Sequence, residues 1–215
     1  GGDARGGAEA LAEAVGWLER RQGPSGGWSA ARWRGQAMYD VGLTGLAVIA
    51  LVDADSGPTA GSRLRPALLR AAGFLLDHQA EDGRFGPSAP SALYNHGIAT
   101  VALLEVVGSN PGDRNLATRL RPSIDRALRY IVATRSPQGG WGYLSASDSE
   151  PNTSATAWPL QALIVARALG WDGLDDAISA GLRHMERASD ARGVVGYRRP
   201  GEFLHGSAAL TSMAA

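Results

Sequence analysis

The chain has 215 residues, with 21 basic and 21 acidic side chains and no cysteine. This length suffices for the core of one sizeable domain, and the balanced charge gives no field that would favour nucleic acid or an anionic membrane. The absence of cysteine excludes disulfides, thiolate zinc sites and cysteine nucleophiles.

Neither a membrane span nor a leader is expected from the sequence. No stretch approaches the roughly 20 apolar residues of a membrane-spanning helix. The first residues, GGDARGGAEA, lack the basic-then-apolar pattern of a signal peptide. The sequence therefore assigns no compartment.

Two kinds of apolar segment alternate along the chain. The first kind has apolar residues three or four positions apart, which predicts a helix with one buried face. These stripes are Leu11, Ala14, Val15 and Leu18; Leu64, Leu68, Ala72 and Leu75; Ile124, Ala127, Leu128 and Ile131; and Ile178, Leu182 and Met185. The second kind, which starts at Gly42, Gly97 and Ala155, is apolar nearly all round and should be buried on most sides.

This alternation repeats about every 55 residues, which indicates a repeat architecture. We expect an all-α fold of stacked helical hairpins, with striped outer helices and apolar inner helices, in a solenoid or an α/α toroid. Four repeats are predicted, at about 8–56, 62–109, 118–170 and 174–215, in a single domain over 1–215. The fourth inner helix is short, so we expect an incomplete ring that continues beyond Ala215 in the natural protein.

A glycine-plus-aromatic turn follows each outer segment. The four turns contain Gln22, Gly26 and Trp28; Gln79, Gly83 and Phe85; Arg135, Gly139 and Trp141; and Ser189, Gly193 and Val195. Glycine supplies a left-handed cap after a helix, a Gln or Arg head group can reach carbonyls at a helix end, and the ring covers the corner. We interpret these turns as fastenings between successive hairpins.

The turns resemble the QW-type repeats of the prenyltransferase and squalene–hopene cyclase superfamily, whose fold is an α/α toroid. The resemblance covers essentially the whole chain. The segments YNHGIATVALLEVVG and NTSATAWPLQALIVARALG look most similar to cyclase-like bacterial repeat proteins of unassigned function.

The resemblance does not extend to the catalytic groups of these families. In squalene–hopene cyclases a D-x-D-D-T-A motif supplies the acid, and the matching stretch here is NTSATA. Thr156 and Ala157 agree with the motif, but residues 152–155 carry no carboxylate, and Asp148 and Glu150 lie just upstream. The zinc site of protein prenyltransferases and the thioester of complement-type toroids both need a cysteine. We therefore expect no metal and no cofactor.

Several other polar residues have simple structural interpretations. Asp175 and Asp176 could suggest a magnesium–diphosphate motif, but they stand where an outer helix begins and favour the positive end of its dipole. Asp53 and Asp55 end an inner helix and are interpreted as turn residues. His78 and His184 lie on outer segments without metal-ligand spacing and are interpreted as surface or packing residues.

Polar and aromatic residues directly precede each expected inner helix. They are Tyr39 and Asp40; Tyr94, Asn95 and His96; Asn152, Thr153 and Ser154; and Leu204 and His205. Capping the helix explains such residues. Parallel inner helices would also gather them at one rim, where the partial positive charges of the helix ends favour an anionic or carbonyl-bearing ligand. Tyr39, Tyr94 and Trp158 would then form aromatic walls.

Pro159 gives two alternatives for the third inner helix. Proline is tolerated in the first turn of a helix but removes a hydrogen bond further in. Either the helix begins near Thr156 and residues 152–155 form a loop at the rim, or the helix is kinked.

Three functions are compatible with these observations. The first is a non-catalytic binding or scaffold protein, with a hydrophobic or anionic small molecule or a protein as its partner. The second is an enzyme on isoprenoid or other hydrophobic substrates that uses an unusual acid such as Asp40 or has essential parts beyond Ala215. The third is a glycan-processing enzyme, for which Asp40 and Glu150 are the only plausible carboxylate pair. No nucleic acid is expected, and no oligomeric state is predicted.

Overall fold

The computed structural model describes residues 2–55, 63–89, 91–143, 150–202 and 207–214, and these contain helices and no named strand. The predicted all-α fold is confirmed and is compatible with an α/α toroid. The helices are α1 (Gly2–Arg21), α2 (Asp40–Asp55), α3 (Arg65–Asp77), α4 (Ala92–Gly108), α5 (Arg114–Ala133), α6 (Thr153–Ala168), α7 (Asp175–Ala188) and α8 (Ser207–Ala214). Two short 3-10 helices, η1 (Ala30–Trp33) and η2 (Ala37–Tyr39), connect α1 to α2.

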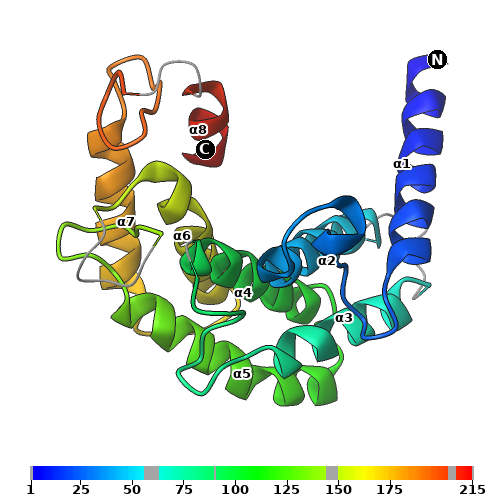
Figure 1. The fold of residues 1–215 in the computed structure, drawn as a ribbon. Helices are drawn as coiled ribbons and strands as arrows, with labels where there is room; N and C mark the ends of the chain where they lie inside the picture. Colours follow the sequence, from blue (N-terminus) through cyan, green and yellow to red (C-terminus); the bar gives the residue numbers. More distant parts are fainter. Residues whose placement is uncertain (1, 56–62, 90, 144–149, 203–206, 215) are drawn as a thin grey trace.

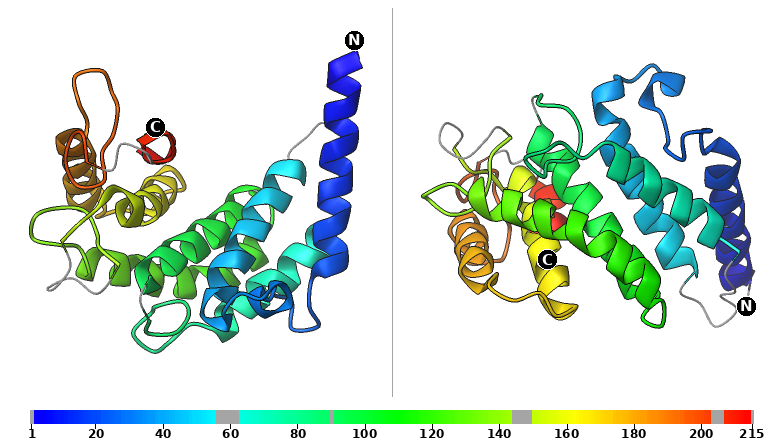
Figure 2. Two further views of the ribbon diagram at one scale, coloured as in Figure 1. Left: turned by 45° about the horizontal axis from the view of Figure 1, so that its top comes forward. Right: turned by 90° about the horizontal axis from the view of Figure 1, so that it is seen from below.

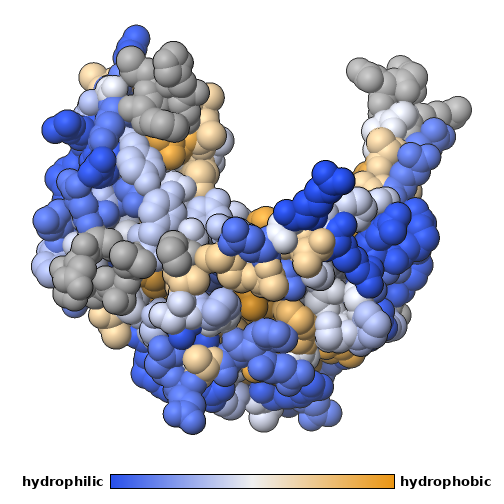
Figure 3. Space-filling model, in the orientation of Figure 1, coloured by the Kyte–Doolittle hydropathy of each residue, from blue (hydrophilic) through white to orange (hydrophobic). Residues whose placement is uncertain are grey.

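The helices form two curved layers in an open horseshoe (Figures 1 and 2). The inner layer is α2, α4, α6 and α8, in which α4 packs between α2 and α6, and α8 packs against α6. Of the outer helices, α3 contacts α2 and α4, and α5 contacts α4 and α6. Helix α7 contacts α6. Polar residues dominate the outer edge of the horseshoe, and most of the exposed apolar residues in this view lie near its middle (Figure 3).

The predicted apolar stripes form most of the interface between the layers. Ile124, Ala127, Leu128 and Ile131 of α5 are all buried. Three stripe residues are exposed instead: Leu11 and Ala14 of α1 and Leu182 of α7, of which Leu11 and Leu182 are 56% and 45% exposed. They lie on α1 and α7, at the two ends of the horseshoe (Figure 1).

Glycines allow the inner helices to approach each other closely. A Cβ atom on Gly97 of α4 would lie 2.8 Å from Cβ of Trp158 and 2.9 Å from the nitrogen of Pro159 in α6. Contacts this short would force the backbones apart, so only glycine fits there.

The segment Ala37–Asp55 is long and apolar enough to cross a membrane by length and composition, although no such stretch was expected from the sequence. Within this segment α2 packs against α1, α3 and α4 and buries residues such as Val48 and Leu51 completely. An apolar helix that is covered by neighbours is the ordinary core helix of a folded domain. The structure thus gives no firm membrane span.

The third inner helix starts earlier than one alternative predicted. Helix α6 begins at Thr153, and Pro159 lies inside it. The Asn152 side chain caps the helix, because its Oδ1 accepts a hydrogen bond of 2.9 Å from the Ala155 N–H. The suggestion that residues 152–155 form a loop is therefore wrong.

The first three glycine–aromatic turns fasten a hairpin to the next outer helix, as predicted. The Gln22 Nε2 donates to the carbonyls of Gly26 and Ala67, both at 2.8 Å, and Ala67 belongs to α3. In the same way, the Gln79 Nε2 donates to Gly83 and to Ser123 of α5, both at 2.9 Å. The sequence suggested that these side chains reach carbonyls at the end of the preceding helix. Instead, the carbonyls of Ala67 and Ser123 belong to the outer helix that follows the turn. We call each turn–helix contact a latch.

The latch glycines have a backbone conformation and a packing that both require glycine. Gly26, Gly83 and Gly139 have φ angles of +90°, +94° and +80°. Added Cβ atoms would lie 2.2, 2.5 and 2.8 Å from the carbonyl oxygens of Arg70, Arg126 and Ala180, in the same order. Gly193 has the same conformation, but nothing in the described part of the chain lies within 4 Å of its Cβ position.

Candidate functional site

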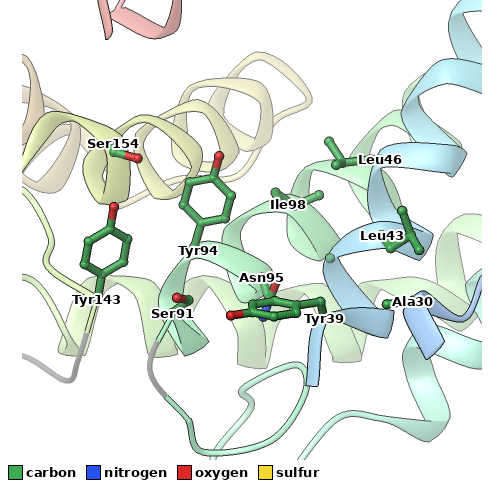
Figure 4. Close-up of a pocket in the computed structure, with 11 residues that line it drawn as sticks. Ala30, Tyr39, Leu43, Leu46, Ser91, Tyr94, Asn95, Ile98, Tyr143 and Ser154 are labelled. Atoms are coloured by element: carbon green, nitrogen blue, oxygen red, sulfur yellow. The ribbon is translucent and has the colours of Figure 1, made fainter. Parts of the chain in front are cut away.

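A cavity of about 490 Å³ lies at the N-terminal rim of the inner helices (Figure 4). Its wall combines the starts of α2 and α4 with single residues from the third turn and from α6. The lining residues are Ala30, Tyr39, Gly42, Leu43, Leu46, Ser91, Tyr94, Asn95, Ile98, Tyr143 and Ser154. We call it the tyrosine cavity.

The predicted gathering of polar residues at one rim is found for four residues. Tyr39, Tyr94, Asn95 and Ser154 all line the tyrosine cavity. The approach of α2 to α4 brings them together, since Gly42 packs directly against the Asn95 side chain. Asn95 also donates through Nδ2 to the Met38 carbonyl at 3.2 Å, which fixes its orientation.

The tyrosine cavity has a polar end and an apolar end. The hydroxyl groups of Tyr94, Tyr143 and Ser154 lie toward the same end in Figure 4, and three aliphatic side chains line the other. The aliphatic residues are Leu43, Leu46 and Ile98. None of the lining residues among those described carries a charge, so the wall suits an elongated apolar molecule with one polar group.

Tyr143 lines the tyrosine cavity but was not predicted as a site residue. Its hydroxyl hydrogen-bonds the hydroxyl of Tyr197, and burial, followed by this bond, raises the pKa of Tyr197. Two bonds of 2.8 Å hold the Tyr197 segment on α6, because Thr153 donates its N–H to the Tyr197 carbonyl and its hydroxyl to that of Gly196. Tyr143 lies two residues after Trp141, and Tyr197 lies two residues after the equivalent Val195. This equivalent spacing is the feature of the sequence that could have indicated that the two tyrosines belong together.

The two carboxylates considered as acids do not line the tyrosine cavity. The Asp40 Oδ1 accepts a hydrogen bond of 2.7 Å from the Ala30 N–H and so fixes the start of η1. Glu150 is exposed and forms an ion pair with Arg198, which also pairs with Glu202. Neither Asp40 nor Glu150 is therefore placed to donate a proton into the tyrosine cavity.

His96 lies between the two helical layers and not in the cavity wall. It is fully buried, its Nδ1 accepts the Phe85 N–H at 2.9 Å, and its Nε2 lies 3.1 Å from the Ala127 carbonyl. Because Nδ1 must accept and Nε2 must donate, the ring is neutral. Burial lowers the pKa of His96 to about 4, which agrees with this state.

The bond that His96 makes has a counterpart in every repeat. The backbone N–H groups of Trp28, Trp141 and Val195 donate to the hydroxyls of Thr44, Thr156 and Thr211 at 3.0, 2.9 and 3.0 Å. In the second repeat Ala99 occupies the threonine place, and His96, one helical turn earlier, supplies the acceptor. His96 is therefore a structural residue of the second turn.

The remaining predicted site residues that the structure describes do not line the tyrosine cavity. Asn152 is the buried cap of α6. Trp158 lines a second cavity of about 460 Å³ between α6, α7 and α8, and its ring meets that of Tyr94 edge-on with centroids 6.3 Å apart. Its Nε1 is buried and has no hydrogen-bond partner in the described part of the chain. Leu204 and His205 lie outside the described residues.

Most of the other acidic and histidine residues have the structural positions that the sequence indicated. Asp175 and Asp176 form the first turn of α7. Asp53 and Asp55 end an inner helix as expected, but they belong to the last turn of α2 and not to the turn after it. His78 stacks on Phe74, and His184 is buried, which lowers its pKa. Among the described residues no group of three or more His, Cys, Asp or Glu side chains could hold a metal ion.

Comparison with known proteins gives one distant similarity. No family model matches the chain. The drimenyl diphosphate synthase of Streptomyces showdoensis is 30% identical over 149 residues, which cover 69% of this chain and 26% of that protein. The chain thus spans about a quarter of the length of this relative. The similarity supports a terpenoid cyclase-like fold and leaves the type of repeat untested.

Proposed function

We propose that the protein binds an apolar ligand of the isoprenoid class in the tyrosine cavity and does not start cyclisation by protonating it. The observation that carries this proposal is the uncharged wall, with aliphatic side chains at one end and hydroxyls at the other. Burial of apolar groups would drive binding, at ~0.8 kcal/mol for each methylene removed from water. The similarity to a protein named for a terpenoid diphosphate supports the choice of ligand class.

The chemistry of the wall argues against acid catalysis in this cavity. Protonation of an alkene needs a strong acid, whereas the phenol of an ordinary tyrosine has a pKa of about 10. The carboxylate nearest in sequence to a lining residue is Asp40, which is engaged by a backbone N–H. Binding without turnover is therefore the simplest function for these residues.

An enzyme on isoprenoid substrates is the second candidate, and the similarity to a synthase favours it. In that case Asp40, which follows the lining residue Tyr39, is the first residue to test as an acid. Asp40→Asn would then abolish turnover and leave ligand binding intact. A glycan-processing role has less support, because Glu150 is exposed and paired with Arg198.

The proposal predicts that filling the tyrosine cavity blocks binding. Leu46→Trp enlarges a side chain that lines this cavity, and Ile164→Trp is the matched control, because Ile164 lines the second cavity and both residues are 43% exposed. We expect Leu46→Trp to weaken farnesol binding by about tenfold or more and Ile164→Trp to bind as the wild type does. Equilibrium titration measures both, and thermal unfolding checks that both variants fold.

Two results would contradict the proposal. Wild-type protein that binds neither farnesol nor the hydrocarbon farnesene would remove its basis. Equal loss of binding in Leu46→Trp and Ile164→Trp would move the ligand out of the tyrosine cavity.

A further inference from the structure

Among the described residues, the polar end of the tyrosine cavity has hydroxyl groups and no basic side chain. None of the described lining residues is basic, and the undescribed residues 144–149 next to Tyr143 read LSASDS, with no basic side chain. Arg84 donates to the Gly86 carbonyl, and Arg198 is paired with Glu150 and Glu202. A phosphorylated head group at this end would find no counter-charge among the described residues that line it.

An anionic head group at this place would gain no ion pair with the described lining residues. Tyr94, Tyr143 and Ser154 are half-buried, so such a group would lose part of its hydration without gaining a counter-charge. The starts of α2 and α4 lie at the cavity and contribute partial positive charges, but each is only about half an elementary charge and is screened at the surface. Such partial charges suit the lone pairs of a neutral oxygen and do not neutralise a diphosphate.

The Tyr143 side chain can contact Tyr197 and a ligand at the same time. The two phenols are hydrogen-bonded to each other. A phenol oxygen can donate one hydrogen bond and accept others, so the bond to Tyr197 leaves Tyr143 able to make a second one. The Tyr143 hydroxyl lies at the polar end of the cavity (Figure 4).

We infer that the ligand carries a neutral oxygen, as an alcohol, ether or carbonyl, and that the Tyr143 hydroxyl, oriented by Tyr197, donates the hydrogen bond that recognises it. This inference rests on the proposed function, because it concerns the same cavity. Tyr143 touches the ligand, and Tyr197 is a positioning residue.

Three probes with one hydrocarbon chain test this inference: farnesol, farnesene and farnesyl diphosphate. We expect wild-type protein to bind farnesol about tenfold more tightly than farnesene, as one added hydrogen bond allows, and to bind the diphosphate less tightly than farnesol, with or without Mg²⁺. Isothermal titration at one fixed salt concentration measures all three affinities.

Tyrosine-to-phenylalanine variants assign the preference to the hydroxyl pair. Tyr143→Phe should lower the affinity for farnesol to that for farnesene and leave farnesene binding unchanged. Tyr197→Phe should reduce the preference in the same direction, because the Tyr143 hydroxyl loses its fixed orientation. Tyr130→Phe is the matched control, since Tyr130 packs against His96 outside the cavity and should keep the wild-type preference.

The outcomes separate this inference from the proposed function. Binding of none of the three probes overturns both. Tightest binding of the diphosphate, or an unchanged preference for farnesol in Tyr143→Phe, overturns the inference and leaves an apolar ligand site in place. Should Tyr143→Phe fail to fold, the ranking of the three probes on wild-type protein still decides whether the head group is neutral.

Discussion

His96 replaces a threonine with a group that titrates. Three repeats use an uncharged threonine hydroxyl to accept the turn N–H, whereas the second uses an imidazole that must stay neutral to accept the N–H of Phe85. The same structural bond is therefore insensitive to pH in three repeats and sensitive in one.

We expect the free energy of unfolding to fall as the pH falls from about 6.5 to 4. Burial lowers the pKa of His96 in the folded protein from 6.5 to about 4, so within this window the unfolded chain binds a proton that the folded chain does not. The contribution of the neutral His96 to the free energy of unfolding is fully present above about pH 6.5. It decreases by on the order of 3 kcal/mol as the pH falls to about 4. Urea unfolding at a series of pH values measures the slope.

A double variant isolates this contribution from that of other groups. His96→Val with Ala99→Thr copies Val41 and Thr44 of the first repeat and should keep an acceptor for the turn while removing the imidazole. Its slope between about pH 6.5 and 4 should be smaller than that of the wild type, and His184, which also has a lowered pKa, would account for part of what remains. An unchanged slope would show that His96 does not titrate in this window. Arg84 lowers and Asp82 raises the pKa of His96, so both stay unchanged in the variant.

At the scale of elements, the latches show that turns and outer helices are packed as one unit. The glycine of each of the first three turns lies against a carbonyl of the next outer helix, and a glutamine or arginine side chain adds a hydrogen bond to that helix. The fourth turn has the same shape without such a partner in the described residues, which provides an internal comparison.

Gly83→Ala should destabilise the protein more than Gly193→Ala does. Both glycines have positive φ angles, of +94° and +78°, and alanine in such a conformation costs about 1 kcal/mol. Only at Gly83 would the new Cβ also collide with a backbone oxygen, that of Arg126, so we expect a total loss of roughly 3 kcal/mol there. Chemical denaturation at neutral pH gives both values. Equal losses would mean that the latch contact contributes nothing beyond the backbone conformation.

The sequence predicted which elements meet but not where some of them begin. The regular spacing of the repeats predicted that the turns fasten successive hairpins to each other. The hydrogen bonds of Gln22 and Gln79 to the next outer helix confirm this for the first two turns. The start of α6 could not be predicted, because Thr153 is held by the carbonyls of Gly196 and Tyr197, more than 40 residues away. Contacts at that separation decide the conformation of a residue whose local sequence permits both loop and helix.

Helical geometry explains which rim residues reach the tyrosine cavity. Successive residues of an α-helix are about 100° apart around its axis, so Ile98 shares the face of Tyr94 whereas His96 points to the other side. This rule could have identified Ile98 and excluded His96. It could not have found Tyr143, whose position depends on a contact between the third and fourth turns.

At the scale of the whole molecule, the protein is a stack in which contacts join neighbouring hairpins. Helix α4 lies between two inner neighbours, whereas α8 packs against α6 alone in the inner layer, and Leu11 in the first half of α1 is largely exposed. In such stacks the ends open more easily than the middle.

Amide hydrogen exchange should therefore be slowest in α4 and fastest in α8 and in the first half of α1. Each amide exchanges through local opening, and opening α4 breaks contacts with α2, α6 and α5 together. Exchange followed by mass spectrometry on peptides from each helix tests this order. Equal protection of α4 and α8 would indicate that the whole chain opens as a single cooperative unit.

The latches also have an evolutionary consequence. Each covalent repeat consists of an outer helix, a turn and an inner helix, but each turn holds the outer helix of the following repeat. Loss of one whole period would bring the turn of Gln22 to α5, where Ser123 would offer the carbonyl that Ala67 offers in α3. Duplication or deletion of a period would therefore keep this hydrogen bond between turn and outer helix, and we expect such a chain to tolerate changes of length in whole periods.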